Sequence, residues 1–141
     1  MKKIIKKTLN FSIVLMLTFA MYGCPEPFPE QTLTYENLSN EDVLFEESIK
    51  LYPDTSLMDK NPFEKMEVYN LRTIKVGKEF KFNGDYQGYL KNFSKFSVFI
   101  FSKKVIDTTP WDSVRNNYLI LKRYDLDLKT LDSLNWRVTY R

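Results

Sequence analysis

Cys24 is the only cysteine in the 141-residue chain, and the chain contains no histidine. Zinc, copper and haem sites are built mainly from cysteine and histidine side chains, so the sequence lacks the usual ligand sets for these groups. A lone cysteine also cannot form a disulfide within the chain. The sequence therefore predicts a domain that folds without cofactor, metal or disulfide, and the thiol of Cys24 must serve another kind of chemistry.

The residues before Cys24 have the layout of a bacterial export signal. A positively charged start, made by Lys2, Lys3, Lys6 and Lys7, precedes the apolar run 11–21 and the small residue Gly23. The apolar run falls within the roughly 7 to 15 residues of a signal peptide and is shorter than the ~20 that a transmembrane helix needs. This length favours a segment that is removed.

The sequence Met21-Tyr22-Gly23-Cys24 resembles the bacterial lipobox, in which a diacylglycerol is attached to the cysteine and the chain is cut just before it. We therefore expect residues 1–23 to be a lipoprotein signal peptide and Cys24 to be the lipidation site. The lipid would then hold the chain at a membrane. The alternative is an ordinary secretory signal followed by a buried free cysteine.

Removal of residues 1–23 changes the charge of the chain. The precursor has 21 basic and 18 acidic residues, a net charge of +3, but the removed residues hold four lysines and no acid. The mature chain therefore has 17 basic and 18 acidic residues, or −1. Because recognition of nucleic acid needs a basic surface on the folded domain, we expect no nucleic-acid partner.

Carboxylates are the remaining candidates for catalysis, since a pair of them is sufficient for glycoside hydrolysis. The candidates are Asp54, Asp107, Asp112, Asp125, Asp127 and Asp132. Asp112 and Asp127 have a simpler explanation at predicted helix starts, and Asp54 in a predicted turn. The serines lack a histidine base, and the four glycines form no phosphate-binding loop. We therefore expect the protein not to be an enzyme.

Large flat side chains could instead bind a sugar. The candidates for a carbohydrate platform are Trp111, Tyr118, Trp136 and Tyr140. The alternative is core packing, because each of these side chains falls on the apolar face of its predicted element.

The chain could also carry sugar. Three short segments resemble the aspartate-hydroxyl pattern of O-glycosylation in Bacteroides-type envelopes: Asp107-Thr108-Thr109, Asp112-Ser113-Val114 and Asp132-Ser133-Leu134. Thr108 is the best candidate, because we expect it in a loop before Pro110, whereas the two serines fall inside predicted helices.

The elements that must position these residues begin after a short tether. Prolines at positions 25, 27 and 29 deny the backbone hydrogen-bond donors, so we expect residues 24–31 to be a proline-rich linker. Residues 32–141 then form one globular domain. Its 11 phenylalanines and nine tyrosines, counted over the whole chain, favour strands over helices.

Alternating apolar residues predict a hairpin over 32–51 and a second one over 68–82, separated by a turn at 52–56 and a loop at 57–67. The segment 86–93 is ambiguous. The uninterrupted apolar run 96–101 predicts a central strand that is covered on both faces.

The last third of the chain predicts two short helices. Thr109-Pro110-Trp111 predicts a capped helix start, and residues 119–124 favour a strand. Asp127 predicts a second cap before the apolar stripe Leu128, Leu131 and Leu134, with Asn135 as a left-handed terminator and a final strand at 136–140. The expected fold class is mainly β (α+β), a small β-sandwich-like domain of antiparallel strands with two short C-terminal helices.

Several blocks of the mature chain resemble those of small cell-envelope lipoproteins of Bacteroides-type bacteria, a family with no assigned activity. They are Leu51-Tyr52-Pro53-Asp54-Thr55-Ser56-Leu57, Phe99-Ile100-Phe101, Trp111, Leu121-Lys122-Arg123-Tyr124-Asp125-Leu126, Leu134-Asn135-Trp136 and Tyr140. The resemblance implies a lipid-anchored protein of the outer membrane, facing the periplasm or the surface. We expect a structural domain or one that binds an envelope protein; the alternative is a carbohydrate-binding accessory protein with a glycan partner.

Overall fold

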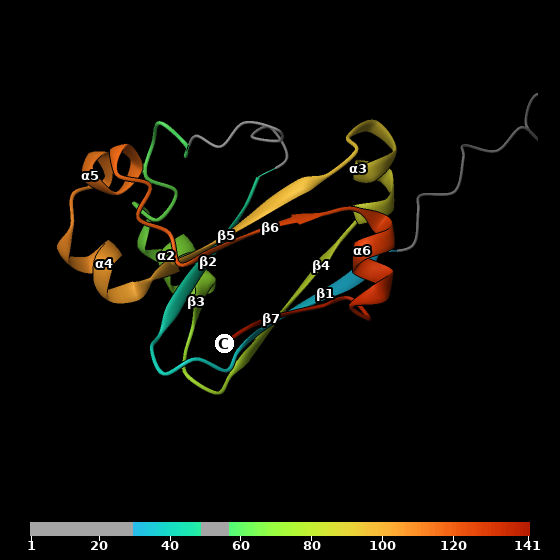
Figure 1. Ribbon diagram of the computed structural model, residues 1–141, viewed down its shortest axis with the longest axis horizontal. Helices are drawn as coiled ribbons and strands as arrows, with labels where there is room; N and C mark the ends of the chain where they lie inside the picture. Colours follow the sequence, from blue (N-terminus) through green and yellow to red (C-terminus); the bar gives the residue numbers. More distant parts are fainter. Residues whose placement is uncertain (1–29, 49–56) are drawn as a thin grey trace, which may run out of the picture.

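Two β-sheets lie face to face in the computed structural model, which describes residues 30–48 and 57–141 (Figure 1). One sheet has the strand order β4-β1-β7 and the other β3-β2-β5-β6. The strands are β1 (Gln31–Asn37), β2 (Val43–Ser48), β3 (Thr73–Ile74), β4 (Glu79–Gly84), β5 (Phe96–Ser102), β6 (Lys122–Leu126) and β7 (Arg137–Tyr140). The expected mainly-β sandwich is therefore confirmed.

Helices lie at both ends of the sandwich (Figure 1). The described residues contain α2 (Met66–Arg72), α3 (Tyr86–Asn92), α4 (Lys103–Thr108), α5 (Trp111–Asn116) and α6 (Leu128–Ser133). The sequence predicted only α5 and α6, so the expectation of two helices was too low. Among the described residues, Leu33 is the first that belongs to either hydrophobic core, so a chain starting at residue 24 contains all of the described packing.

The space between the sheets holds the larger hydrophobic core. Its fully buried members include Leu33 and Tyr35 from β1 and Phe45 from β2, each at most 1% exposed. Tyr35 and Phe45 stack across the two sheets with their ring centroids 4.3 Å apart. The alternation predicted for the first strand is thus confirmed.

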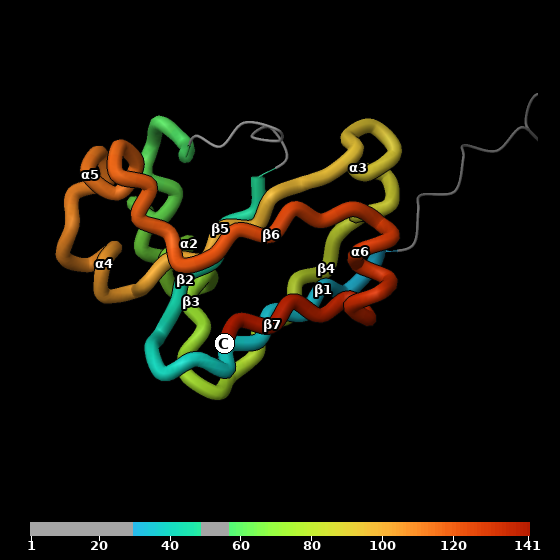
Figure 2. Tube along the Cα trace, in the orientation of Figure 1, coloured from blue at the N-terminus to red at the C-terminus, as the bar shows by residue number. Residues whose placement is uncertain are grey.

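A second core covers the outer face of the sheet that contains β5. Leu44 and Phe99 on this face pack against Leu57, Phe63 and Val114, which come from the segment before α2 and from α5. The tube in Figure 2 shows this third layer, with α4 and α5 at one end of the sheet. All seven residues of β5 are buried as a result, which confirms the prediction of a central strand covered on both faces.

Both predicted hairpins are wrong, because successive strands enter different sheets. β1 pairs with β4 and β7, whereas β2 pairs with β3 and β5. The same separation divides β3 from β4, and Gly77 between these two strands has a positive φ of 67°. The alternation of apolar and polar residues shows which face of a strand is buried, but it does not show which other strand pairs with it.

Two further expectations need correction. Residues 66–72 form the helix α2, although 66–67 were expected in a loop and 68–72 in a hairpin. In addition, β7 runs parallel to β1, although all strands were expected to be antiparallel. The ambiguous segment 86–93 forms α3, whose start is capped by the Asp85 carboxylate accepting from the Gly88 amide at 2.7 Å.

The two predicted C-terminal helices are present with different details. Asp127 caps α6 by accepting from the Thr130 amide at 2.8 Å, and Asn135 is left-handed with φ of 50°, as expected. Pro110, and not Thr109, is the residue that precedes α5, and no side chain caps it. Leu134 is 40% exposed, so the predicted apolar stripe of α6 is buried only partly.

Cys24, the signal peptide, most of the tether and the predicted turn at 52–56 lie outside the described residues. Within the described ranges, no helix is long and apolar enough to cross a membrane.

Candidate binding pocket

The structure separates the four aromatic residues expected to form a carbohydrate platform. Trp111 on α5 packs against Phe101, with ring centroids 5.9 Å apart, and Trp136 packs against Tyr86 at the same distance. α5, which begins at Trp111, and α6, which ends at Ser133 shortly before Trp136, lie at opposite ends of the molecule (Figure 1). Tyr118 is 38% exposed and Tyr140 is half-buried. These side chains therefore do not form one surface.

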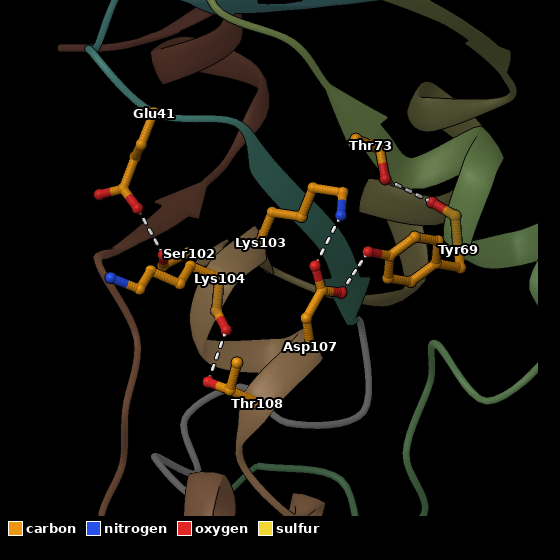
Figure 3. A network of polar contacts seen from close by, with 8 residues as sticks. All are labelled: Glu41, Tyr69, Thr73, Ser102, Lys103, Lys104, Asp107 and Thr108. Atoms are coloured by element: carbon orange, nitrogen blue, oxygen red, sulfur yellow. Dashed lines mark hydrogen bonds and ion pairs between the residues drawn. The ribbon is translucent and has the colours of Figure 1, made fainter.

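The candidate carboxylates are also distributed over separate contacts. Asp125 accepts from Ser97, Asp127 caps α6, and Asp107 accepts from Tyr69 and Lys103 (Figure 3). The Lys103 ammonium holds the pKa of the Asp107 carboxyl below its usual range. In the ranges 30–48 and 57–141, no three acidic or cysteine side chains gather into a group that could hold a metal ion.

Thr108 lies at the end of α4 and not in a loop. Its side chain is exposed, and its hydroxyl donates to the Lys104 carbonyl at 2.8 Å (Figure 3). Ser113 and Ser133 are in α5 and α6 as expected, so all three hydroxyls are helical. The reason for preferring Thr108 is therefore wrong, and its glycosylation stays a prediction.

A pocket of about 410 Å³ opens at the end of the sandwich beside α3. Its walls are mostly aromatic and aliphatic, and its polar groups come from β2, α2, β4 and the segments flanking α3. It is lined by Glu47, Arg72, Phe82, Asn83, Gly84, Asp85, Tyr86, Tyr89, Leu90, Phe93, Lys95 and Phe96. A concave apolar site with a few converging polar groups is the usual form of a small-molecule site.

Glu47, one of the residues that line this pocket, is held in place by two tyrosines. One of its carboxylate oxygens, Oε1, accepts from the Tyr86 hydroxyl at 2.9 Å and also from the Tyr35 hydroxyl. Burial, reinforced by the Glu47 charge, raises the pKa of both tyrosines, so both hydroxyls stay protonated and remain donors. This pairing fixes Tyr86, whose ring also stacks on Phe96 with centroids 5.5 Å apart.

Arg72 supplies a positive charge to the same pocket. Its guanidinium carbon lies 5.1 Å from the ring centroid of Phe45 and 5.6 Å from that of Phe82, so the group is placed between the two sheets. The nearest carboxylate contact joins Arg72 Nε to Glu46 Oε2 at 3.9 Å, which is beyond hydrogen-bond distance. Nε and Nη1 of Arg72 are buried and have no hydrogen-bond partner among the described residues.

Comparison with protein-family models, with curated proteins and with solved structures finds no match for this chain. Sequence reasoning did not select any residue of the pocket as a site, because Arg72 fell in a segment taken for a strand. The run Phe82 to Phe96, dense in aromatic residues, was the one available signal.

Glu46 should make the stability of the domain depend on pH. Burial raises the pKa of Glu46 from 4.5 to about 7 and outweighs the opposing effect of Arg72. A carboxyl whose pKa is higher in the folded state stabilises the fold below its unfolded pKa, and this contribution is lost as pH rises towards the folded pKa. The loss attributable to Glu46 is about 3 kcal/mol across this window.

The variant Glu46→Gln, which cannot ionise, tests this effect. We expect wild type to lose more unfolding free energy than Glu46→Gln between about pH 4 and about pH 8, as measured by urea denaturation. Parallel pH profiles for the two chains would show that Glu46 titrates normally.

Proposed function

We propose that the protein is a lipid-anchored, non-catalytic binding domain of the bacterial cell envelope. The observation that carries the binding role is the pocket beside α3. There, apolar walls meet a guanidinium with two nitrogens that have no hydrogen-bond partner within residues 30–48 and 57–141. The anchor is supported by the lysine-rich start, the apolar run and Gly23 before Cys24. The candidate carboxylates are distributed among separate helix caps, hydrogen bonds and ion pairs, which favours a binding role over a catalytic one.

The position of the domain relative to Cys24 fits this proposal. β1 begins at Gln31, and an extended chain advances at most about 3.5 Å per residue, so the linker limits the domain to within about 25 Å of the lipid. A pocket held at this distance could sample ligands at the membrane surface.

A glycan-binding role is the second candidate. It is favoured by Tyr89 and Phe93, which line the pocket and are 52% and 44% exposed. These two rings replace the platform expected from the sequence. Titrating the protein with soluble envelope glycans while monitoring its intrinsic fluorescence tests this role.

The anchor is tested by replacing Cys24 with serine in the native host. Labelled palmitate should enter wild type and be absent from Cys24→Ser, because the serine hydroxyl cannot form the thioether that precedes acylation. Wild type should fractionate with membranes, and the variant should be uncleaved or released. Equal labelling of the two proteins would reject the lipid anchor.

A further inference from the structure

We propose that the pocket beside α3 binds an amphipathic monocarboxylate, with its carboxylate at Arg72 and its apolar body against the aromatic wall. This inference rests on the proposed binding function and names the class of ligand. It commits to one small molecule in the pocket and not to a protein or glycan partner.

Arg72 lines the pocket with part of its hydrogen-bonding capacity unused. A buried donor without an acceptor is costly, and Nε and Nη1 of this guanidinium have no partner among the described residues. The planar fork of arginine matches a carboxylate through two parallel hydrogen bonds. Nε and Nη1 lie on different edges of the guanidinium, and each shares its edge with Nη2. A ligand carboxylate would therefore accept from one of them together with Nη2, which Glu46, at 3.9 Å from Nε, does not do.

Charged side chains of both signs line the pocket. Arg72 and Lys95 line it as cations, and Glu47 and Asp85 line it as anions. Both anions already accept hydrogen bonds, Glu47 from two tyrosine hydroxyls and Asp85 from the Gly88 amide. The group with the least satisfied hydrogen-bonding capacity is thus the Arg72 cation, which favours an anionic ligand.

The wall of the pocket is mostly apolar. The apolar lining residues are Phe82, Tyr86, Tyr89, Leu90, Phe93 and Phe96. Such a wall favours an alkyl chain or an aromatic ring over a hydrated sugar, because apolar surface gains from leaving water. A volume of about 410 Å³ lies within the range of small-molecule sites and suits a body of moderate size.

Three matched probes test the inference: phenylbutanoate, phenylbutanamide and phenylbutylamine, which share one apolar body and differ in charge. Each is titrated calorimetrically into residues 24–141 with serine at position 24, a chain that contains both hydrophobic cores. We expect wild type to bind the carboxylate about tenfold or more tightly than the amide, and the amine least.

Variants assign this preference to one side chain. Arg72→Met keeps most of the volume and should reduce the carboxylate-to-amide ratio to about one, whereas Arg72→Lys should restore part of it. Arg115→Met is the matched control, because Arg115 pairs with Asp59 at 2.6 Å and does not line the pocket. Thermal melting of each variant identifies any variant that fails to fold. The comparison of the three probes on wild type does not depend on the variants.

The outcomes separate the inference from the proposed function. Equal binding of the carboxylate and the amide, tighter binding of the amine, or a preference that survives in Arg72→Met would overturn the inference and leave the pocket as a binding site. Absence of binding by all three probes and by envelope glycans would overturn the binding function as well.

Discussion

Replacing Phe45 with alanine is expected to lower the free energy of unfolding by about 4 kcal/mol, the usual cost of removing a buried phenylalanine. Phe45 has no exposed surface and lies in the inter-sheet core. Its ring stacks on Tyr35 at 4.3 Å and contacts Phe80 at 5.3 Å. The cavity left by alanine would therefore open between the two sheets, where neither can move without loss of pairing.

Urea denaturation of the serine-24 mature chain measures this effect. Phe93→Ala is the matched control, because Phe93 is 44% exposed and its removal should cost less than about 1 kcal/mol. Similar losses for the two variants would contradict the assignment of Phe45 to the core between the sheets.

Phe45 also links the core to the candidate pocket. The Arg72 guanidinium lies over its ring at 5.1 Å and over Phe82 at 5.6 Å, one ring from each sheet. A charge placed between two aromatic rings is held in position by them. The pocket therefore depends on the register of both sheets, which explains why no single stretch of sequence revealed it.

The sequence predicted elements better than it predicted their partners. The apolar run ending at Phe101 and the Asp127 cap are local signals, and both are confirmed. Pairing is not local, because the same alternating face of β1 suits a neighbour in either sheet. The predicted hairpins failed for this reason.

Helix α2 shows the second limit of sequence reasoning. It has no fully buried residue, and Met66 and Leu71 are 70% and 52% exposed, so its apolar residues do not form the stripe that marks a packed helix. Its position is set by tertiary contacts such as the hydroxyl of Tyr69 donating to the Asp107 carboxylate on α4. Because α2 was missed, so was the role of Arg72 at its end.

The crossing from β1 to β2 depends on Asn37, which is 1% exposed. Its side-chain amide donates to the carbonyls of Glu41 and Ile74 at 2.8 and 2.9 Å, and its Oδ1 accepts from the Ser39 amide at 3.0 Å. The side chain thus satisfies backbone groups of the corner and of β3 together. Asparagine fits this position because it carries both donors and an acceptor.

Replacing Asn37 with aspartate is expected to cost about 4 kcal/mol, because it removes both donors and buries a charge facing two carbonyls. The loss should be smaller at low pH, since a protonated carboxyl restores one donor. Asn83→Asp is the control, because Asn83 is exposed. Its Oδ1 accepts from the Thr32 hydroxyl at 2.8 Å, and a carboxylate oxygen can accept in the same way. Urea denaturation at neutral and acidic pH measures both variants. If Asn37→Asp were as stable as Asn83→Asp at neutral pH, the corner that sends β1 and β2 into different sheets would not depend on this side chain.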